Sequence, residues 1–183
     1  EIDGSNLRAI AVLRDEGACT TEIANDYAAF LDHALYLGAS FCTTNPPLVD
    51  MAWKALPGKW DPVIQGIIRS HPEDSLEELS RLATLEIVGE SLRLLRPIFL
   101  LTAGEMGCVC LQVNPHLDTA DAMASEALWY YEQLRERLHG GVPNVRFKII
   151  GTQAGLGAAR ILVGQGIGVT ITVNFGMFQH IPF

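Results

Sequence analysis

Apolar, strand-like runs that carry polar side chains are the feature that most constrains the fold of this 183-residue chain. Four such runs lie at residues 40–45, 108–114, 145–150 and 167–174, with helix-like stretches between them. Strands that alternate with helices indicate βαβ units and a parallel sheet. Strands of an open doubly wound sheet are apolar throughout, because both of their faces are buried. Since Thr170 and Thr172 alternate with Ile171 and Val173, we favour a (β/α)₈ TIM barrel, whose strands point one face into a functional interior.

Five strands are expected in all, whereas a complete barrel has eight in ~250 residues. The additional strand comes first in the chain, at residues 1–4, and we expect only its final part to be present. The expected helices cover residues 5–15, 20–37, most of 48–97, 118–138 and 153–165, and a further helix starts after Phe175. We therefore predict one α/β domain over residues 1–183, incomplete at both ends. It holds about five βα units and a helical insert at about residues 48–105.

Composition excludes several classes of partner. A net charge of −8 argues against nucleic acid, which requires a basic surface, but a small phosphorylated substrate needs only a local basic pocket. The four cysteines form no CxxC pair and the five histidines have no ligand spacing, so we expect free thiols and no metal site. Without a long apolar segment or a signal peptide at the first residue, we expect no membrane span and a cytoplasmic location.

Lys148 lies in the middle of the third run, Val145-Arg146-Phe147-Lys148-Ile149-Ile150. A lysine within a strand is costly to bury unless it is neutral or paired. A neutral lysine amine is a nucleophile that forms Schiff bases with carbonyl compounds. The alternative is a solvent-facing lysine on an edge strand, where it would discourage aggregation.

Three motifs give the chain a resemblance to the transaldolase family. They are Thr43-Thr44-Asn45-Pro46 at a strand end, Leu111-Gln112-Val113-Asn114-Pro115-His116-Leu117, and Asn144 to Ile149 followed by Gly151-Thr152-Gln153-Ala154-Gly155-Leu156. The strand from Gly166 to Thr172, continuing to Gln179, is similar as well. Order, spacing and structural context all agree with the family, and a weaker match lies at residues 1–6.

The resemblance implies a role for each matching residue. Lys148 would form the Schiff base, and Asp3 would be the first-strand carboxylate that exchanges a proton with a substrate hydroxyl. The catalytic water would be held by Thr172 and Gln112. Substrate hydroxyls would be bound by Asn45, Thr43 and Thr170.

Each of the supporting residues also has a structural interpretation. Asn45 has the position of a helix cap, and Asp3 that of a turn residue before Gly4. Gln112 and Thr172 fit a hydrogen-bonded polar layer in a barrel.

Departures from the family pattern keep alternatives open. Gln112 replaces the glutamate of transaldolases and resembles the fructose-6-phosphate aldolase branch, whereas the long helical insert resembles the transaldolase branch. Ile150-Gly151 stands where a proline is usual. The phosphate-binding residues of the family would lie beyond Phe183.

The resemblance implies transfer of a dihydroxyacetone unit between sugar phosphates through Lys148, with no cofactor and a possible homo-oligomer. One alternative is a direct aldolase of the same mechanism, and another is a non-catalytic relative that binds sugar phosphates. A third is dinucleotide binding at Gly155-Leu156-Gly157, although Arg160 takes the place of the third glycine.

Overall fold

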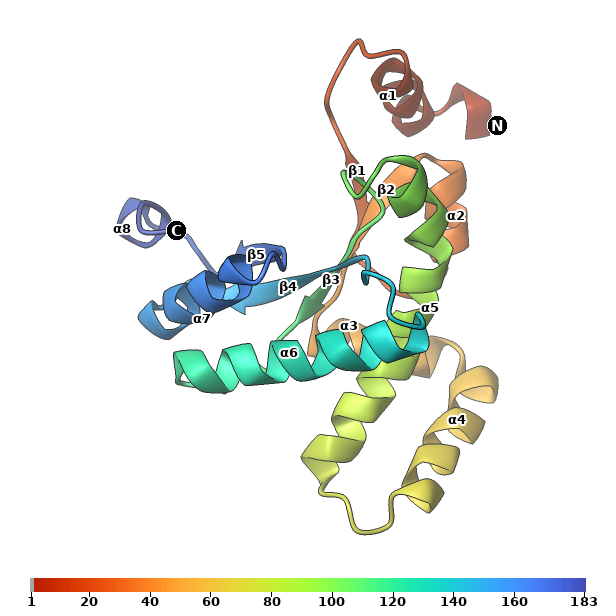
Figure 1. Cartoon of the computed structure of the whole chain (residues 1–183). Coiled ribbons are helices and arrows are strands. Elements are labelled where there is room, and N and C mark those ends of the chain that lie inside the picture. Colours follow the sequence, from red (N-terminus) through yellow and green to blue (C-terminus); the bar gives the residue numbers. More distant parts are fainter. Residues whose placement is uncertain (1) are drawn as a thin grey trace. The chain divides into compact units, whose positions relative to one another are not determined.

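The structure is a computed structural model that describes residues 2–183. Its chain divides into two compact units, residues 1–109 and 110–183, with the boundary inside one strand. The elements of the first unit are a 3₁₀ helix η1 (Ile2–Gly4), α1 (Asn6–Asp15), β1 (Ile23–Asn25), α2 (Leu31–Tyr36), β2 (Ala39–Thr43), α3 (Pro46–Ala55), α4 (Pro57–Ser70) and α5 (Leu76–Leu101). β3 (Val109–Gln112) crosses the boundary, and α6 (Ala120–Arg137), β4 (Val145–Ile150), α7 (Gln153–Gly164), β5 (Val169–Thr172) and α8 (Met177–His180) follow (Figure 1).

The five strands form one sheet in the order β1-β2-β3-β4-β5. β1 pairs with β2 in parallel, as β4 does with β5, and helices connect every pair of successive strands. A doubly wound sheet reverses its strand order at a switch point, and this sheet does not. The fold is therefore α/β, with about five βα units in the order of a (β/α)₈ barrel, as the polar alternation of the strands predicted.

Sequence reasoning was wrong about the first strand. The expected strand tail at residues 1–4 is the 3₁₀ helix from Ile2, and Glu1 lies outside the described residues. Within the expected helix at 20–37, β1 occupies Ile23–Asn25 and α2 starts only at Leu31. β1 has three residues, none of them buried, and its pairing with β2 defines it as a strand. So short a segment carries no periodicity of its own.

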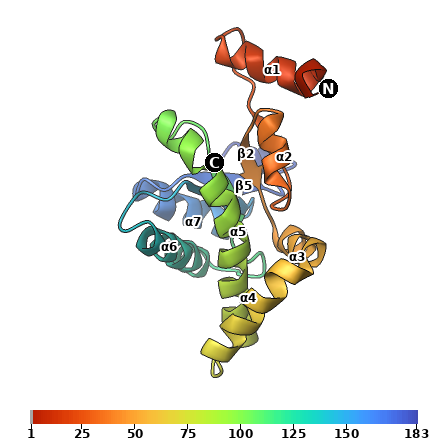
Figure 2. The ribbon, with the colours of Figure 1, turned by 90° about the vertical axis from the view of Figure 1, so that its right-hand side faces the viewer.

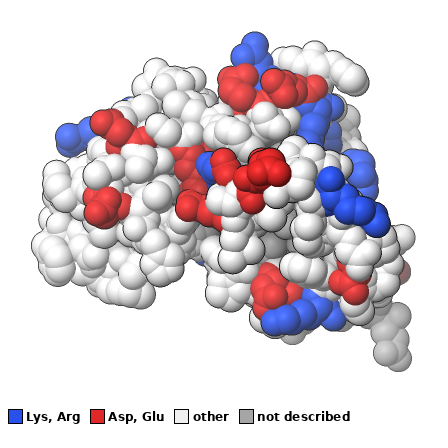
Figure 3. All heavy atoms as spheres, turned by 90° about the horizontal axis from the view of Figure 1, so that it is seen from below, with Lys and Arg blue, Asp and Glu red and all other residues white. Residues whose placement is uncertain are grey.

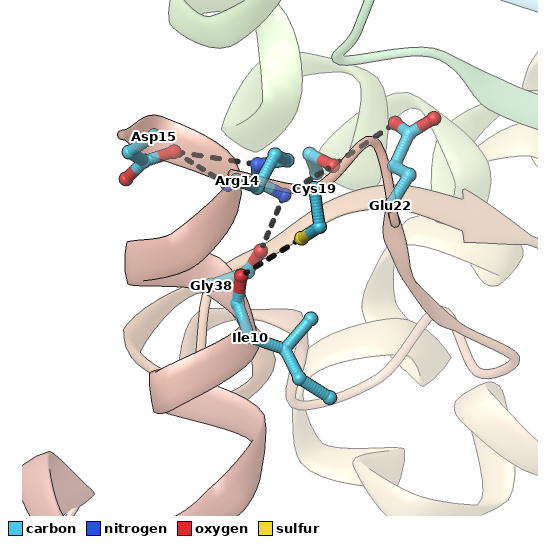
Figure 4. Close-up of polar contacts among 7 residues, drawn as sticks. Ile10, Arg14, Asp15, Cys19, Glu22 and Gly38 are labelled. Atoms are coloured by element: carbon cyan, nitrogen blue, oxygen red, sulfur yellow. Dashed lines mark hydrogen bonds and ion pairs between the residues drawn. The ribbon is translucent and has the colours of Figure 1, made fainter. Parts of the chain in front are cut away.

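Helix α1 packs on the amino end of β2 (Figure 4). Gly38, with φ +96°, lets the helix approach: a Cβ there would lie 2.2 Å from the Cβ of Ala11, which is fully buried. Arg14 Nη1 donates to the Gly38 carbonyl and to Ser40 Oγ, each at 3.2 Å, and Ser40 Oγ donates to Glu22 Oε1 at 2.9 Å. Because Ser40 is buried, this chain of hydrogen bonds satisfies its hydroxyl and ties α1 to the sheet.

Three helices occupy most of the predicted insert. Asn45 caps α3, and Pro57 occupies the first turn of α4, where its missing N–H costs nothing. Ser75 and Glu78 form a capping box at the start of α5. α4 and α5 run side by side in opposite directions (Figures 1 and 2).

Candidate active site

β4 places Lys148 on the strand face opposite its buried side chains. Val145, Phe147 and Ile149 are at most 5% exposed, whereas Arg146 and Lys148 are part-exposed. Side chains alternate across a strand, so Lys148 points away from the face that Phe147 and Ile149 bury. α6 and α7 lie together along one side of β4 and contact it (Figure 1).

β4 has a hydrogen-bonded neighbour on each side, β3 and β5. The interpretation of Lys148 as an edge-strand lysine is therefore wrong. Its amine makes no hydrogen bond or ion pair with any residue of the described range 2–183. Lys148 is thus a part-exposed lysine on an interior strand.

The neighbouring strand β5 places its two threonines beside this lysine. Lys148 is the register partner of Thr170, and Ile150 is that of Thr172. In-register residues of parallel strands share a face, so Thr170 and Thr172 lie on the Lys148 face. The Thr170 hydroxyl is 2.9 Å from Cys110 Sγ, which comes from β3 and is fully buried. Hydroxyl groups therefore follow the lysine face toward the carboxyl end of the sheet.

Gln112 is the last residue of β3 and is part-exposed. The next residue, Val113, donates its N–H to the Lys148 carbonyl at 3.1 Å. This hydrogen bond brings the end of β3 to the level of Lys148. Four of the predicted residues (Lys148, Gln112, Thr170 and Thr172) thus lie on three adjacent strands of one unit.

Gln179 joins the loops that follow β4 and β5. Its amide nitrogen donates to the carbonyls of Gly151 and Val173, at 3.0 and 3.3 Å. Its oxygen accepts the N–H groups of Phe175 and Gly176, both at 3.1 Å. Active sites of β/α barrels are built at the carboxyl ends of the strands. Gln179 therefore connects the two loops at the carboxyl ends of β4 and β5.

The first unit holds the other predicted residues, and two of them are Thr43, the last residue of β2, and Asn45, which precedes α3. Asn45 Oδ1 accepts the Leu48 N–H at 2.8 Å, so the helix-cap interpretation of Asn45 is confirmed. The Thr43 hydroxyl donates to the carboxylate of Asp26, an exposed residue that directly follows β1.

Asp3 does not occupy the first strand. It is an exposed residue of the 3₁₀ helix η1, so its predicted position as the first-strand carboxylate is wrong. The carboxylate at the end of the first strand is that of Asp26, which sequence reasoning missed. The available signal was the short run Ile23-Ala24-Asn25 before Asp26, but the expected helix over residues 20–37 concealed it.

The glycines after β4 serve packing between helix and strand. A Cβ on Gly155 would lie 2.0 Å from the Ile150 carbonyl oxygen, and one on Gly157 would lie 2.7 Å from the Ala120 Cβ of α6. The Gly155 N–H is taken by the Thr152 hydroxyl at 3.0 Å, which caps α7. These contacts explain both glycines without a bound dinucleotide, and the strand order lacks the switch point at which such ligands bind.

A pocket of about 360 Å³ lies in the first unit, between the start of α2 and helices α3, α4 and α5. Phe30, Trp60, Ile87 and Glu90 are among its lining residues, and none of the candidate site residues is. Lys59 pairs with Glu90 at this pocket and lies over the Trp60 ring, 4.7 Å from its centroid.

The charged side chains on the face shown in Figure 3 do not form a large basic patch, as expected for a chain with a net charge of −8. Acidic and basic side chains are interspersed there, without a continuous basic field. Within residues 2–183 no group of three or more His, Cys, Asp or Glu side chains is arranged to hold a metal ion. None of the helices described there has the length and apolar character of a membrane span.

Comparison with known proteins assigns the family. The model of the transaldolase/fructose-6-phosphate aldolase family matches residues 8–182, and the chain belongs to this family. The match begins after Asp3 and includes Asp26.

Three relatives illustrate the similarity. Transaldolase 2 of Streptomyces avermitilis is 26% identical over 175 residues, which are 93% of this chain and 43% of the relative. The transaldolase of Thermobifida fusca is 36% identical over 109 residues, 58% of this chain and 27% of the relative. That of Thiobacillus denitrificans is 30% identical over 171 residues, 92% and 41% of the two chains. The chain thus spans less than half the length of these relatives.

Proposed function

We propose that this chain carries the Schiff-base centre of a transaldolase, which transfers a dihydroxyacetone unit between sugar phosphates. The observation that carries the proposal is the position of Lys148: its side chain lies on an interior strand, on the Thr170 face, and makes no ion pair within residues 2–183. The motif around Lys148 and the family of the chain support the same reaction.

The reaction begins when the neutral Lys148 amine attacks the ketose carbonyl. The carbinolamine loses water and becomes an iminium, and the electron pair of the Cα–Cβ bond flows into this iminium to leave an enamine. As that bond breaks, a carboxylate takes the proton of the neighbouring hydroxyl and an aldose leaves. The remaining enamine adds to an acceptor aldose, and water then hydrolyses the new iminium to release the product and restore the amine.

Asp26 takes the proton-transfer role in this proposal, in place of Asp3. It follows β1 at the carboxyl end, where barrel enzymes place catalytic groups, and it accepts a hydrogen bond from Thr43. Gln112 and Thr172 hold the water that enters and leaves. A glutamine binds water but does not exchange a proton with it, so its part is to orient the molecule.

Hydroxyl groups of the substrate are bound by Thr43, Asn45 and Thr170. The Asn45 amide nitrogen is left for this purpose, because the helix cap uses the oxygen. A cytoplasmic location and a homo-oligomeric state remain predictions.

The experiment that tests the proposal is reductive trapping. The full chain is incubated with fructose 6-phosphate and borohydride, which reduces an iminium to a stable amine, and the modified peptide is identified by mass spectrometry. We expect the adduct on Lys148. The Lys148→Met variant should lose the adduct and at least about 10³-fold in activity, because the covalent path is gone. Its melting temperature should be unchanged or slightly higher, since the polar amine of a part-buried side chain is replaced by an apolar group of similar size.

Lys59→Met is the matched control, because it removes a lysine of the first unit that pairs with Glu90. It should be trapped like the unaltered protein. Trapping of Lys148→Met at the normal rate would refute the proposal. Erythrose 4-phosphate as acceptor separates the two aldol chemistries: a transaldolase needs it for turnover, whereas a direct aldolase releases dihydroxyacetone without it.

A further inference from the structure

Glu126 is a buried carboxylate that the proposed reaction does not use. It lies on α6 and is 6% exposed. Its Oε2 accepts the backbone N–H of Asn114 at 2.6 Å, the short distance of a charge-assisted hydrogen bond. A carboxylate is costly to bury unless such bonds compensate for the lost water. This hydrogen bond therefore links Glu126 to the turn that contains Asn114.

That turn leads directly out of the candidate site. Asn114 is two residues beyond Gln112, and between them Val113 donates its N–H to the Lys148 carbonyl. Asn114 Oδ1 in turn accepts the His116 N–H at 3.0 Å. The backbone after Gln112 is thus held on one side by the ladder to β4 and on the other by the Glu126 carboxylate.

We propose that Glu126 is a positioning residue that acts through Gln112. Its carboxylate fixes the start of the β3–α6 turn, and this sets the height and direction of the Gln112 side chain relative to Lys148. The inference rests on the proposed Schiff-base reaction, in which Gln112 orients the water lost from the carbinolamine.

Glu126→Gln is the variant of choice, because glutamine keeps the size of the side chain. It removes the charge that strengthens the bond to Asn114, and one of its two terminal atoms cannot accept a hydrogen bond. Displacements of about 1 Å near a reacting centre cost rates on the order of 10²-fold. We expect the rate of borohydride trapping in Glu126→Gln to fall about 10- to 100-fold.

A double-mutant cycle distinguishes positioning from general stability. Trapping rates are measured for the unaltered chain, Glu126→Gln, Gln112→Ala and the double variant, with melting temperatures for all four. If Glu126 acts through Gln112, Glu126→Gln should change the rate less than about twofold once Gln112 is absent. Glu132→Gln is the matched control on the same helix, since Glu132 is a half-exposed partner of Arg135, and it should be trapped at the normal rate.

Independent, multiplicative losses from the two substitutions would overturn the inference, as would an equal loss in Glu132→Gln. If Glu126→Gln does not fold, Glu126→Asp takes its place, because it keeps the charge but is shorter by one methylene. We expect a smaller loss of trapping rate in Glu126→Asp, and this loss should also disappear when Gln112 is replaced by alanine. Absence of trapping in the unaltered chain would refute the proposed function itself. Normal trapping of the unaltered chain, together with independent effects of the two substitutions in the double-mutant cycle, would refute only the role of Glu126.

Discussion

The two units of the chain differ in how well their sequences predict their helices and strands. In residues 110–183 three central elements carry a strong local signal: β4 alternates buried and part-exposed residues, and Thr119 and Thr152 cap the helices α6 and α7. In residues 2–109 the first strand is three residues long and contributes no buried side chain. Local pattern is thus sufficient where a strand buries large side chains at every second position, and insufficient where pairing alone defines the strand.

The candidate site follows the same division. Lys148 and the three predicted residues near it, Gln112, Thr170 and Thr172, come from the regular unit, whose strand positions were predicted from sequence. In the irregular unit, the prediction selected Asp3 as the first-strand carboxylate, whereas the structure places Asp26 directly after β1.

The largest expected effect tests this correction. Asp26→Asn removes the carboxylate but keeps its size, and general acid–base catalysis is worth about 10²–10⁴-fold. We expect a loss of turnover in that range, measured with fructose 6-phosphate and an acceptor aldose, while borohydride trapping at Lys148 persists. Asp3→Asn is the control and should keep full turnover. The reverse result would restore Asp3 and invalidate the structural assignment of the first strand.

A smaller effect, on stability, concerns the regular unit. An alanine Cβ at Gly155 would lie 2.0 Å from the Ile150 carbonyl oxygen, so α7 or β4 must move. Overpacking of this kind costs about 1–3 kcal/mol, and we expect Gly155→Ala near the upper limit because the obstacle is backbone. Urea unfolding would measure the difference in free energy.

Gly164→Ala on the same helix is the matched control, because nothing lies within 4 Å of its Cβ position. It should leave the free energy of unfolding unchanged or raise it by up to ~1 kcal/mol. Equal destabilisation by both substitutions would refute this explanation, because Gly164 lacks the close contact with β4 and alanine is the better helix former.

The smallest effect concerns the capping box of α5 in the irregular unit. Hydrogen bonds from the Ser75 side chain and backbone lower the pKa of Glu78 from its usual 4.5. A carboxyl group with a lowered pKa in the folded state stabilises the fold above pH 4.5, and this contribution disappears as the pH falls through the folded-state pKa. Glu78→Gln should therefore weaken the pH dependence of stability below pH 4.5, in urea unfolding measured across that range.

Because Glu78 is fully exposed, solvent screens the effect and we expect it to be small. Glu77→Gln removes an equal charge from the same turn without the box, and it should alter the pH dependence less than Glu78→Gln. Indistinguishable pH profiles of the two variants would show that net charge alone, and not the bond to Ser75, is responsible.

The sequence by itself indicated the α/β alternation and the family, and it selected Lys148 as the candidate Schiff-base lysine. These follow from local chemistry: the alternating residues of β4, the Asn45 cap, and the motif that surrounds Lys148. Each depends on residues within a few positions of one another, and periodicity and spacing record such relationships directly.

Only the tertiary structure decided which strand is first, which carboxylate follows it, and that β4 lies inside the sheet. β1 exists through its pairing with β2, in which Ile23 lies opposite Ala39 and Asn25 opposite Cys42. Glu126 meets Asn114 because α6 folds back on the end of β3. The physical reason is the same in both cases: a hydrogen bond between segments that are distant in sequence stabilises a conformation that neither segment specifies alone.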